Sequence, residues 1–233
     1  PLWWWGPTIM LIGAVSAVLG ILQGSAQTDL KRLLAFSSIE NVGLMTLSLG
    51  AAVVFLGYHV EALVVIALIA LFFHIVNHAM FKGLLFLSAG AVVAGAGTAN
   101  MEKLGGVIRF LPRTAVAFFL AALAVSAFPP LNGFASEWLI FQTMLVGLSA
   151  PYFLVKAVFL IALTALALAS GITILAFAKA FGMTFLARPR MSDTTHMKEA
   201  SGMMQLSYLF LGSMIIVLGL ASKKAIGYFE HIA

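Results

Sequence analysis

The chain has 233 residues, of which 62% are hydrophobic and only 9% are charged, and its mean hydropathy is +1.09. Soluble domains are about half apolar and a quarter charged, so this composition predicts an integral membrane protein. The net charge of +5 comes from few side chains, and nucleic-acid binding is not expected. The sequence contains no cysteine, which excludes disulfides, iron-sulfur ligation and thiol chemistry. Any redox centre must therefore belong to a partner.

Apolar runs long enough to cross a membrane predict the fold class. A helix of roughly 20 residues spans the hydrocarbon core, and such runs cover residues 7–26, 33–56, 60–93, 114–146, 153–181 and 205–222. The runs are continuous and rich in Ala, Leu and Met, which favours helices over a β-barrel. We therefore expect an all-α, polytopic membrane protein with six transmembrane passes. The third and fourth runs would measure about 50 Å as straight helices, so they must tilt, bend or break.

Basic residues are distributed unevenly between alternate loops. The loops around residues 27–32, 94–113 and 182–204 carry eight Lys and Arg residues, whereas the opposite side has only Lys223 and Lys224. Positively charged loops are retained in the cytoplasm. We therefore expect these three loops to be cytoplasmic, in a multi-pass protein of the cell inner (cytoplasmic) membrane. The first residues lack an initiating Met and a charged leader, so the chain is expected to be a piece of something longer.

The third run contains three titratable side chains at intervals of four residues, His74, His78 and Lys82, with Asn77 beside them. This spacing places all three on one face of a helix. Ionisable groups inside a bilayer are costly and usually face a partner or a water-filled path. Imidazoles and a desolvated lysine can exchange protons near neutral pH. The pattern is typical of a proton wire.

Two other interpretations of this face remain open. The spacing His-x-x-x-His suits a pair of zinc ligands, but no third ligand is evident and the neighbouring Lys82 would repel a cation, so no metal is expected. The polar groups could also serve only to join helices through hydrogen bonds.

The fourth run contains the sequence AFPPLNGFASEW over residues 127–138, which predicts a broken helix. Pro129 and Pro130 remove two amide donors, Gly133 loosens the backbone, and Asn132 can satisfy the freed groups. Broken helices recur at ion sites in transporters. We expect Glu137 in the first turn of the second half-helix, as a carboxyl group that takes up and releases protons. The alternative is a capping or interfacial glutamate.

The second run begins with Asp29, which is expected to cap the helix at its cytoplasmic end. Glu40 lies about two and a half turns into this run, where Ser37, Ser38 and Asn41 could hydrogen-bond it. A functional role and a structural hydrogen-bonding role are both open for Glu40. Two more basic residues, Lys156 and Lys179, lie near span ends and are expected to anchor the chain at the membrane surface.

Several segments resemble the antiporter-like membrane subunits of respiratory complex I and its relatives: DLKRLLAFSSIENVG (29–43), NHAMFKGLLFLSAG (77–90), MEKLGG (101–106) and PPLNGFASEW (129–138). Three motifs, SSIEN, NGFxSEW and FGMTFLARPR, are most similar to those of proteins in the hydrogenase-4 and formate hydrogenlyase branch of that family. The resemblance covers nearly the whole chain.

The resemblance implies a fold of two inverted five-helix repeats. Residues 1–181 then correspond to the second repeat, 182–204 to a cytoplasmic loop and 205–233 to an additional C-terminal helix and tail. The first repeat, with its glutamate and lysine pair, has no counterpart here, which either a truncated or a naturally split subunit would explain. By motif, the relay helix supplies His74, His78 and Lys82, the broken helix supplies Glu137, and Lys31 matches the lysine of an Asp-x-Lys element. Sodium-proton antiporter forms usually have lysine where this chain has Glu137.

The resemblance implies a proton-translocating subunit of a membrane-bound redox complex of the hydrogenase or formate hydrogenlyase type. Such a subunit has no redox site or cofactor of its own, and iron-sulfur clusters and a nickel-iron site are expected in partner subunits. The expected partners are other membrane subunits, a peripheral hydrogenase arm, lipid, and protons or sodium ions. The alternatives are a stand-alone cation-proton antiporter subunit and a non-conducting membrane anchor.

Overall fold

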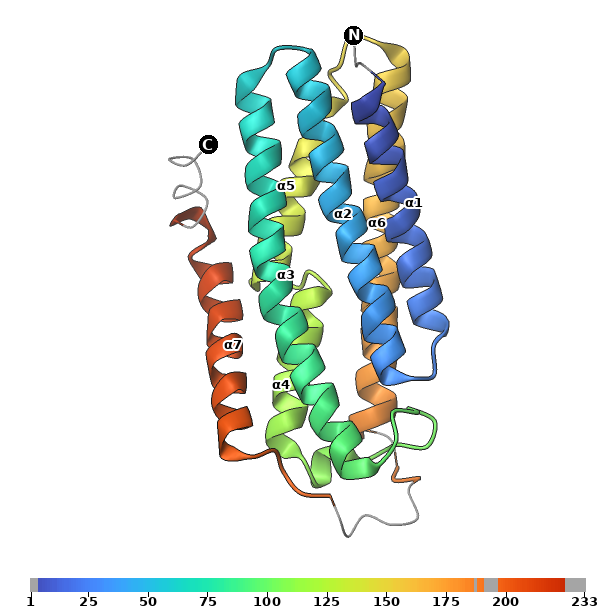
Figure 1. Ribbon diagram of the computed structural model, residues 1–233, viewed down its shortest axis with the longest axis vertical. Coiled ribbons are helices and arrows are strands. Elements are labelled where there is room, and N and C mark those ends of the chain that lie inside the picture. Colours follow the sequence, from blue (N-terminus) through green and yellow to red (C-terminus); the bar gives the residue numbers. More distant parts are fainter. Residues whose placement is uncertain (1–3, 187, 191–196, 225–233) are drawn as a thin grey trace.

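The helices of the chain run side by side along one long axis, as Figure 1 shows for a computed structural model that describes residues 4–186, 188–190 and 197–224. In chain order the elements are α1 (Trp5–Ala26), α2 (Leu30–Gly57), α3 (Glu61–Ala96), η1 (Val107–Arg109), α4 (Pro112–Val125), α5 (Asn132–Gly147), α6 (Phe153–Phe181), η2 (Gly182–Leu186) and α7 (Gly202–Leu220). Within the described ranges, five helices are long and apolar enough to cross a membrane: α1, α2, α3, α6 continued by η2, and α7.

The fourth predicted pass, residues 114–146, is divided between two short helices. α4 has 14 residues and α5 has 16, and the segment between them, residues 126–131, interrupts the helix. The predicted break at Pro129 and Pro130 is therefore confirmed. The third predicted run, residues 60–93, was expected to tilt, bend or break. It is not broken, because it forms one uninterrupted helix of 36 residues, α3. α3 contains no proline, so nothing in its backbone prevents the helical hydrogen bonds from continuing.

Three loops lie at the same end of the bundle, as predicted from their basic residues. Figure 1 shows the α1–α2 and α3–α4 connections at the lower end, together with the C-terminal end of α6 and the N-terminal end of α7. The first two are joined by backbone hydrogen bonds from Leu30 to Ala99 (2.9 Å) and from Met101 to Thr28 (2.8 Å). The guanidinium group of Arg190 donates a further bond of 2.9 Å to the carbonyl oxygen of Met101. The cytoplasmic assignment of this end stays a prediction.

The predicted loop at residues 182–204 begins too early. Gly182 keeps helical backbone angles (φ −59°, ψ −48°), and α6 continues as one π-helical turn, η2, to Leu186. Phe185 is fully buried in this turn, and its ring lies 5.2 Å from that of Phe118 in α4. The apolar contact extends the helix past the glycine. Residues 187 and 191–196 of this loop, and 225–233 of the predicted C-terminal tail, lie outside the described residues.

α1 and α2 pack so closely that their backbones touch. Glycines supply the contact on both helices, because a side chain at Gly13 would lie 2.7 Å from the carbonyl oxygen of Gly43. In the same seam, a side chain at Gly20 would lie 2.7 Å from the amide nitrogen of Glu40. Small residues at helix contacts allow this approach in membrane proteins. The seam fixes the part of α2 that carries Glu40.

Two apolar clusters fill the interior, one toward each end of the bundle. The cluster at the loop end includes Leu34, Phe81 and Phe177, and the cluster at the other end includes Leu44 and Ile140. Between these clusters lies a layer of buried polar side chains: Ser37, Glu40, Asn41, His74, Asn77, Lys82, Asn132, Ser136, Glu137 and Thr173. Buried polar groups inside a membrane are usually functional, so this layer is the candidate site.

Candidate functional site

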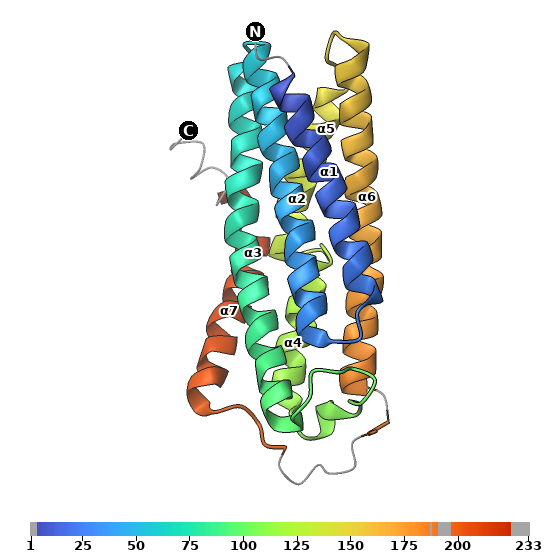
Figure 2. The same ribbon diagram turned by 45° about the vertical axis from the view of Figure 1, so that its right-hand side comes forward.

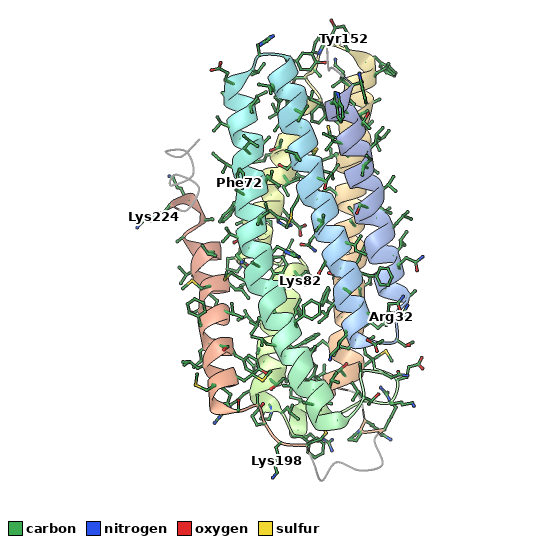
Figure 3. The ribbon with its side chains drawn as sticks, in the orientation of Figure 1. Arg32, Phe72, Lys82, Tyr152, Lys198 and Lys224 are labelled. Carbon is green, nitrogen blue, oxygen red and sulfur yellow. The ribbon has the colours of Figure 1, made fainter. Side chains whose placement is uncertain are left out.

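The face of α3 that carries His74, His78 and Lys82 points into the interior. His74 is fully buried, Lys82 is 5% exposed and His78 is partly buried. Figure 3 shows Lys82 near the middle of the long axis, whereas Tyr152 and Lys198 lie at opposite ends. α3 therefore places three titratable side chains along one stripe at mid-membrane.

His74 connects α3 to the second half of the broken helix. Its Nδ1 lies 2.9 Å from the hydroxyl oxygen of Ser136 in α5. Nε2 of His74 and Nε2 of His78 are both buried and have no hydrogen-bond partner in the described part of the chain. Because a neutral imidazole has one donor and one acceptor nitrogen, each ring keeps one nitrogen available for proton exchange.

Lys82 lies between α3, α2 and α6. Its Nζ donates a hydrogen bond of 3.0 Å to the carbonyl oxygen of Leu34 and lies 5.9 Å from the centre of the Phe177 ring. Lys82 also interacts electrostatically with Glu40. The lysine is thus held by an uncharged carbonyl group close to a buried carboxyl group.

Glu40 is 1% exposed and receives hydrogen bonds from two helices. Its Oε2 accepts from Ser37 (3.4 Å) and Asn41 (3.3 Å), as predicted. The predicted bond from Ser38 is wrong, because its hydroxyl donates to the carbonyl oxygen of Leu34 one turn back in α2. Oε1 of Glu40 instead accepts a short hydrogen bond from the hydroxyl of Thr173 in α6.

Glu137 lies deeper in α5 than predicted. α5 begins at Asn132, so Glu137 is its sixth residue and not part of the first turn. The helix starts early because Gly133 has no side chain, and its backbone can lie against the carbonyl oxygen of Ala124 at the end of α4. Glu137 is 8% exposed, and its Oε2 accepts a hydrogen bond of 2.8 Å from Ser170 in α6. The positive end of the α5 dipole therefore stabilises the ionised carboxylate of Glu137 less than predicted, because this effect falls off beyond the first turn.

A reciprocal pair of asparagines joins α3 to the helix break. The side-chain amide of Asn77 donates to the backbone carbonyl of Asn132 (2.9 Å), and the amide of Asn132 donates back to Oδ1 of Asn77 (3.2 Å). Asn132 was expected to satisfy backbone groups freed by the break. Its side-chain amide instead donates to Asn77, while Asn77 donates to the carbonyl of Asn132, which also accepts from Ser136 within α5. The pair fixes the register between α3 and α5.

The remaining predicted residues lie outside this layer. Asp29 caps α2, because its carboxylate accepts a bond of 2.9 Å from the amide of Arg32, whereas Lys31 beside it is exposed. The predicted part of Lys31 in proton movement stays a prediction. Lys156 is exposed, as expected for an anchor, but Lys179 is half-buried and donates to the carbonyl oxygens of two residues at the end of α1, Ser25 (2.6 Å) and Gln27 (2.8 Å).

Sequence reasoning missed the contribution of α6. Ser170 and Thr173 are three residues apart, and they hold Glu137 and Glu40, respectively. They are polar residues on one side of an otherwise apolar run, and that pattern was available in the sequence. Within the described residues, no group of three His, Asp or Glu side chains is arranged to hold a metal ion.

Known proteins are similar to this chain over nearly its whole length. The curated relatives include hydrogenase-4 component B of Escherichia coli (strain K12), which is 42% identical over 235 residues, covering 99% of this chain and 34% of that protein. They also include formate hydrogenlyase subunit 3 of the same strain, 32% identical over 219 residues and covering 94% of this chain and 36% of that protein. The chain thus spans about a third of the length of these relatives.

The fold also matches a solved membrane complex. A subunit of the Mrp complex from Dietzia sp. DQ12-45-1b aligns with a TM-score of 0.76 at 19% identity, covering 97% of this chain and 45% of that one. The family described as NADH:quinone oxidoreductase/Mrp antiporter, transmembrane, matches residues 2–164. The buried polar layer, the broken helix and these similarities together lead to one assignment. The chain belongs to the NADH:quinone oxidoreductase/Mrp antiporter transmembrane family, with hydrogenase-4 component B and formate hydrogenlyase subunit 3 among its relatives.

Proposed function

We propose that the chain is the proton-conducting part of an antiporter-like subunit in a membrane-bound complex of the hydrogenase or formate hydrogenlyase type. The observation that carries this proposal is the buried layer in which Lys82, Glu40 and Glu137 come from three helices and each hydrogen-bonds to uncharged groups. Glu40 interacts electrostatically with both Lys82 and Glu137. Groups held in this way can change their protonation without losing a fixed ion partner.

The proposed path uses the residues of this layer. Protons would pass between His78, His74 and Lys82 on α3, and between Glu40 and Glu137, with water in the gaps between side chains. General acid–base groups exchange protons over hydrogen-bond distances or through one water molecule. The broken helix supports the proposal, because irregular backbone at membrane depth occurs where it lines a cavity or is buried in protein.

The test is the substitution Glu137→Gln in the assembled complex. Inverted membrane vesicles from cells that carry the variant are assayed for substrate-driven acidification and for dye-linked hydrogenase turnover. We expect proton translocation to be lost while dye-linked turnover is unchanged, because no redox group is expected in this chain. Glu102→Gln is the matched control, since Glu102 is exposed in the loop between α3 and α4. Unchanged proton yield in Glu137→Gln would refute the proposal.

A stand-alone cation-proton antiporter is the second candidate, favoured by the family description, which also covers Mrp antiporters. The two functions differ in what drives ion movement. Sodium-dependent pH changes in vesicles without any redox substrate would support the antiporter. Capture of the chain from gently solubilised membranes separates them further, because nickel-iron and iron-sulfur subunits are expected to co-purify only with the redox-driven complex.

A non-conducting anchor and the membrane location can be tested in the same preparations. Retained proton translocation after His74→Ala combined with His78→Ala would favour the anchor. We propose that the complex is in the cell inner membrane with its basic loops in the cytoplasm. Trypsin applied to inverted vesicles is then expected to cut after Arg190 and Lys198, which are exposed and not followed by proline, and trypsin applied to intact cells is not.

A further inference from the structure

α7 lies against the broken helix along one side of the bundle. It contacts α3, α4 and α5, and Figures 1 and 2 show it beside α3 and α4 with its C-terminal end at the level of the gap between α4 and α5. The proposed proton path does not use any residue of α7. The helix is nevertheless the element that covers the break from the side away from the site.

The contact between α7 and the break is made by Gly219. A Cβ atom at this position would lie 2.8 Å from the amide nitrogen of Asn132 and closer still to the carbonyl oxygen of Pro130. Both atoms belong to the backbone, so no side-chain rotation could make room. Gly219 thus allows the backbone of α7 to rest directly on the first residues of α5.

The break needs such a cover for a physical reason. The first amide groups of a helix have no partner within the helix, and polar backbone groups inside a membrane are tolerated only where protein or water shields them from lipid. α5 starts inside the membrane, and the peptide groups on which Gly219 rests belong to its start. The close contact keeps lipid away from them.

The same few residues also hold the site. Asn132, which Gly219 touches through its backbone, forms the reciprocal pair with Asn77, and Ser136 lies one helical turn further along and bonds His74. A displacement of the start of α5 would therefore change both contacts together. The start of α5 thus contacts α7 on one side and α3 on the other.

α7 is fixed to the other half of the broken helix as well. Just before α7, the carboxylate of Glu199 accepts hydrogen bonds from the amide of Arg113 (2.8 Å) and the hydroxyl of Thr114 (2.6 Å) at the start of α4. The guanidinium of Arg113 donates to the side-chain oxygen of Gln205 (2.5 Å). One end of α7 is tied to the beginning of α4, and the other end rests on the beginning of α5.

We propose that α7 sets the position of α5 relative to α3 and that Gly219 is the positioning residue for proton translocation. This inference rests on the proposed function, because it assigns a role in the same proton path. It predicts that a single methyl group at residue 219 uncouples proton movement from turnover without removing any titratable group.

The test compares three Gly→Ala substitutions on α7 in the complete complex. Gly202 faces open space, Gly212 faces the movable ends of Leu120 and Leu84, and Gly219 faces backbone. Alanine is the better helix former at all three positions, so any loss at residue 219 comes from the contact. Two quantities are measured. One is the amount of assembled complex, and the other is the proton ratio, defined as the number of protons translocated per turnover of the complex with its physiological substrates and no dye.

We expect Gly202→Ala and Gly212→Ala to keep the wild-type proton ratio and Gly219→Ala to lower it by about ten-fold, because small misplacements of reacting groups have large kinetic effects. Simple destabilisation would lower the amount of complex and leave the ratio per complex unchanged. An unchanged ratio in an assembled Gly219→Ala complex would overturn the proposal.

A second variant decides the case in which Gly219→Ala does not assemble. Ile215 is fully buried one turn before Gly219, in the apolar cluster at the loop end, and Ile215→Ala weakens the packing of this part of α7 without adding any atom. We expect it to lower the ratio by about two-fold, and an unchanged ratio would overturn the proposal. Glu137→Gln is measured in parallel. If that variant also leaves the ratio unchanged, the proposed function has failed, whereas loss in Glu137→Gln alone refutes only the role of Gly219.

Discussion

The hydroxyl of Thr173 donates a hydrogen bond to Oε1 of Glu40, which joins α6 to α2 at the centre of the membrane. The same hydroxyl lies 2.9 Å from the carbonyl oxygen of Ala169 within α6. One turn earlier, Ser170 holds Glu137 in the same way. α6 has no titratable residue in this layer, yet it positions both glutamates.

Replacing Thr173 with valine removes this donor and keeps the shape of the side chain. A buried acceptor that loses its partner costs about 1–3 kcal/mol, so Thr173→Val should lower the free energy of unfolding by about that amount and slow proton translocation several-fold. Thr164→Val is the matched control, because Thr164 is exposed on the same helix and also bonds the carbonyl four residues back. Equal effects of the two substitutions on proton translocation would contradict a special role for Thr173.

The pair of Asn77 and Asn132 should behave as one unit. Asn77→Leu or Asn132→Leu alone leaves a buried amide or carbonyl group unpaired, and each is expected to destabilise the protein by about 1–3 kcal/mol. The double substitution removes both partners, so its effect should be smaller than the sum of the single effects. Thermal unfolding of the purified protein in detergent measures the three variants. Simple additivity would show that the two side chains do not interact.

Lys179 should contribute to stability, whereas Lys156 should not. The ammonium group of Lys179 binds carbonyl oxygens at the C-terminal end of α1, where a positive charge is favourable. Lys179→Met should lower the free energy of unfolding by about 1.5–3 kcal/mol, the range for hydrogen bonds to charged groups. Lys156→Met, at an exposed position on the same helix, should change it by less than about 0.5 kcal/mol. The same unfolding assay distinguishes the two.

Glu199 should make the attachment of α7 dependent on pH. Burial raises the pKa of its carboxyl group, whereas the hydrogen bonds from Thr114 and from the amides of Ala200 and Arg113 lower it. The combined effect of the hydrogen bonds is larger, so the pKa lies below its ordinary value of 4.5. A group whose pKa is lowered by folding stabilises the folded state above its unfolded pKa, and this contribution disappears as the pH falls through the folded value.

The measurement is the midpoint of thermal unfolding between pH 7 and pH 3. The wild-type chain should lose more stability below about pH 4.5 than the Glu199→Gln variant, because only the wild type loses these bonds on protonation. Glu102→Gln should follow the wild-type curve, since Glu102 is exposed outside this contact. Identical pH dependence in the wild type and Glu199→Gln would exclude the carboxylate as the source.

Hydropathy and turn chemistry were sufficient to predict most of the fold. The apolar runs located the membrane passes, and the prolines at residues 129 and 130 located the break, because both signals act within one segment of the chain. The start of α5 was less accurate. It depends on the contact between Gly133 and Ala124 across the break, which the local sequence does not reveal.

Only part of the site was predicted, because the sequence pattern reports contacts within one helix and not contacts between helices. The periodicity of α3 placed His74, His78 and Lys82 on one face, and helical spacing gave Ser37 and Asn41 as neighbours of Glu40. The partners from other helices were missed, including Thr173 and the backbone of Leu34. These contacts join residues far apart in the sequence, and periodicity within one helix contains no information about them.

The glycine seam between α1 and α2 determines how Glu40 can move. The amide nitrogen of Glu40 lies against Gly20, and a shift of one helix along the other by a single residue would bring a Cβ atom into a backbone group. α1 and α2 therefore form one rigid unit, and the backbone of Glu40 is held in place within it. Any exchange of its carboxyl group between Thr173 on α6 and Lys82 on α3 is therefore a rotation about side-chain bonds, which requires no helix to slide.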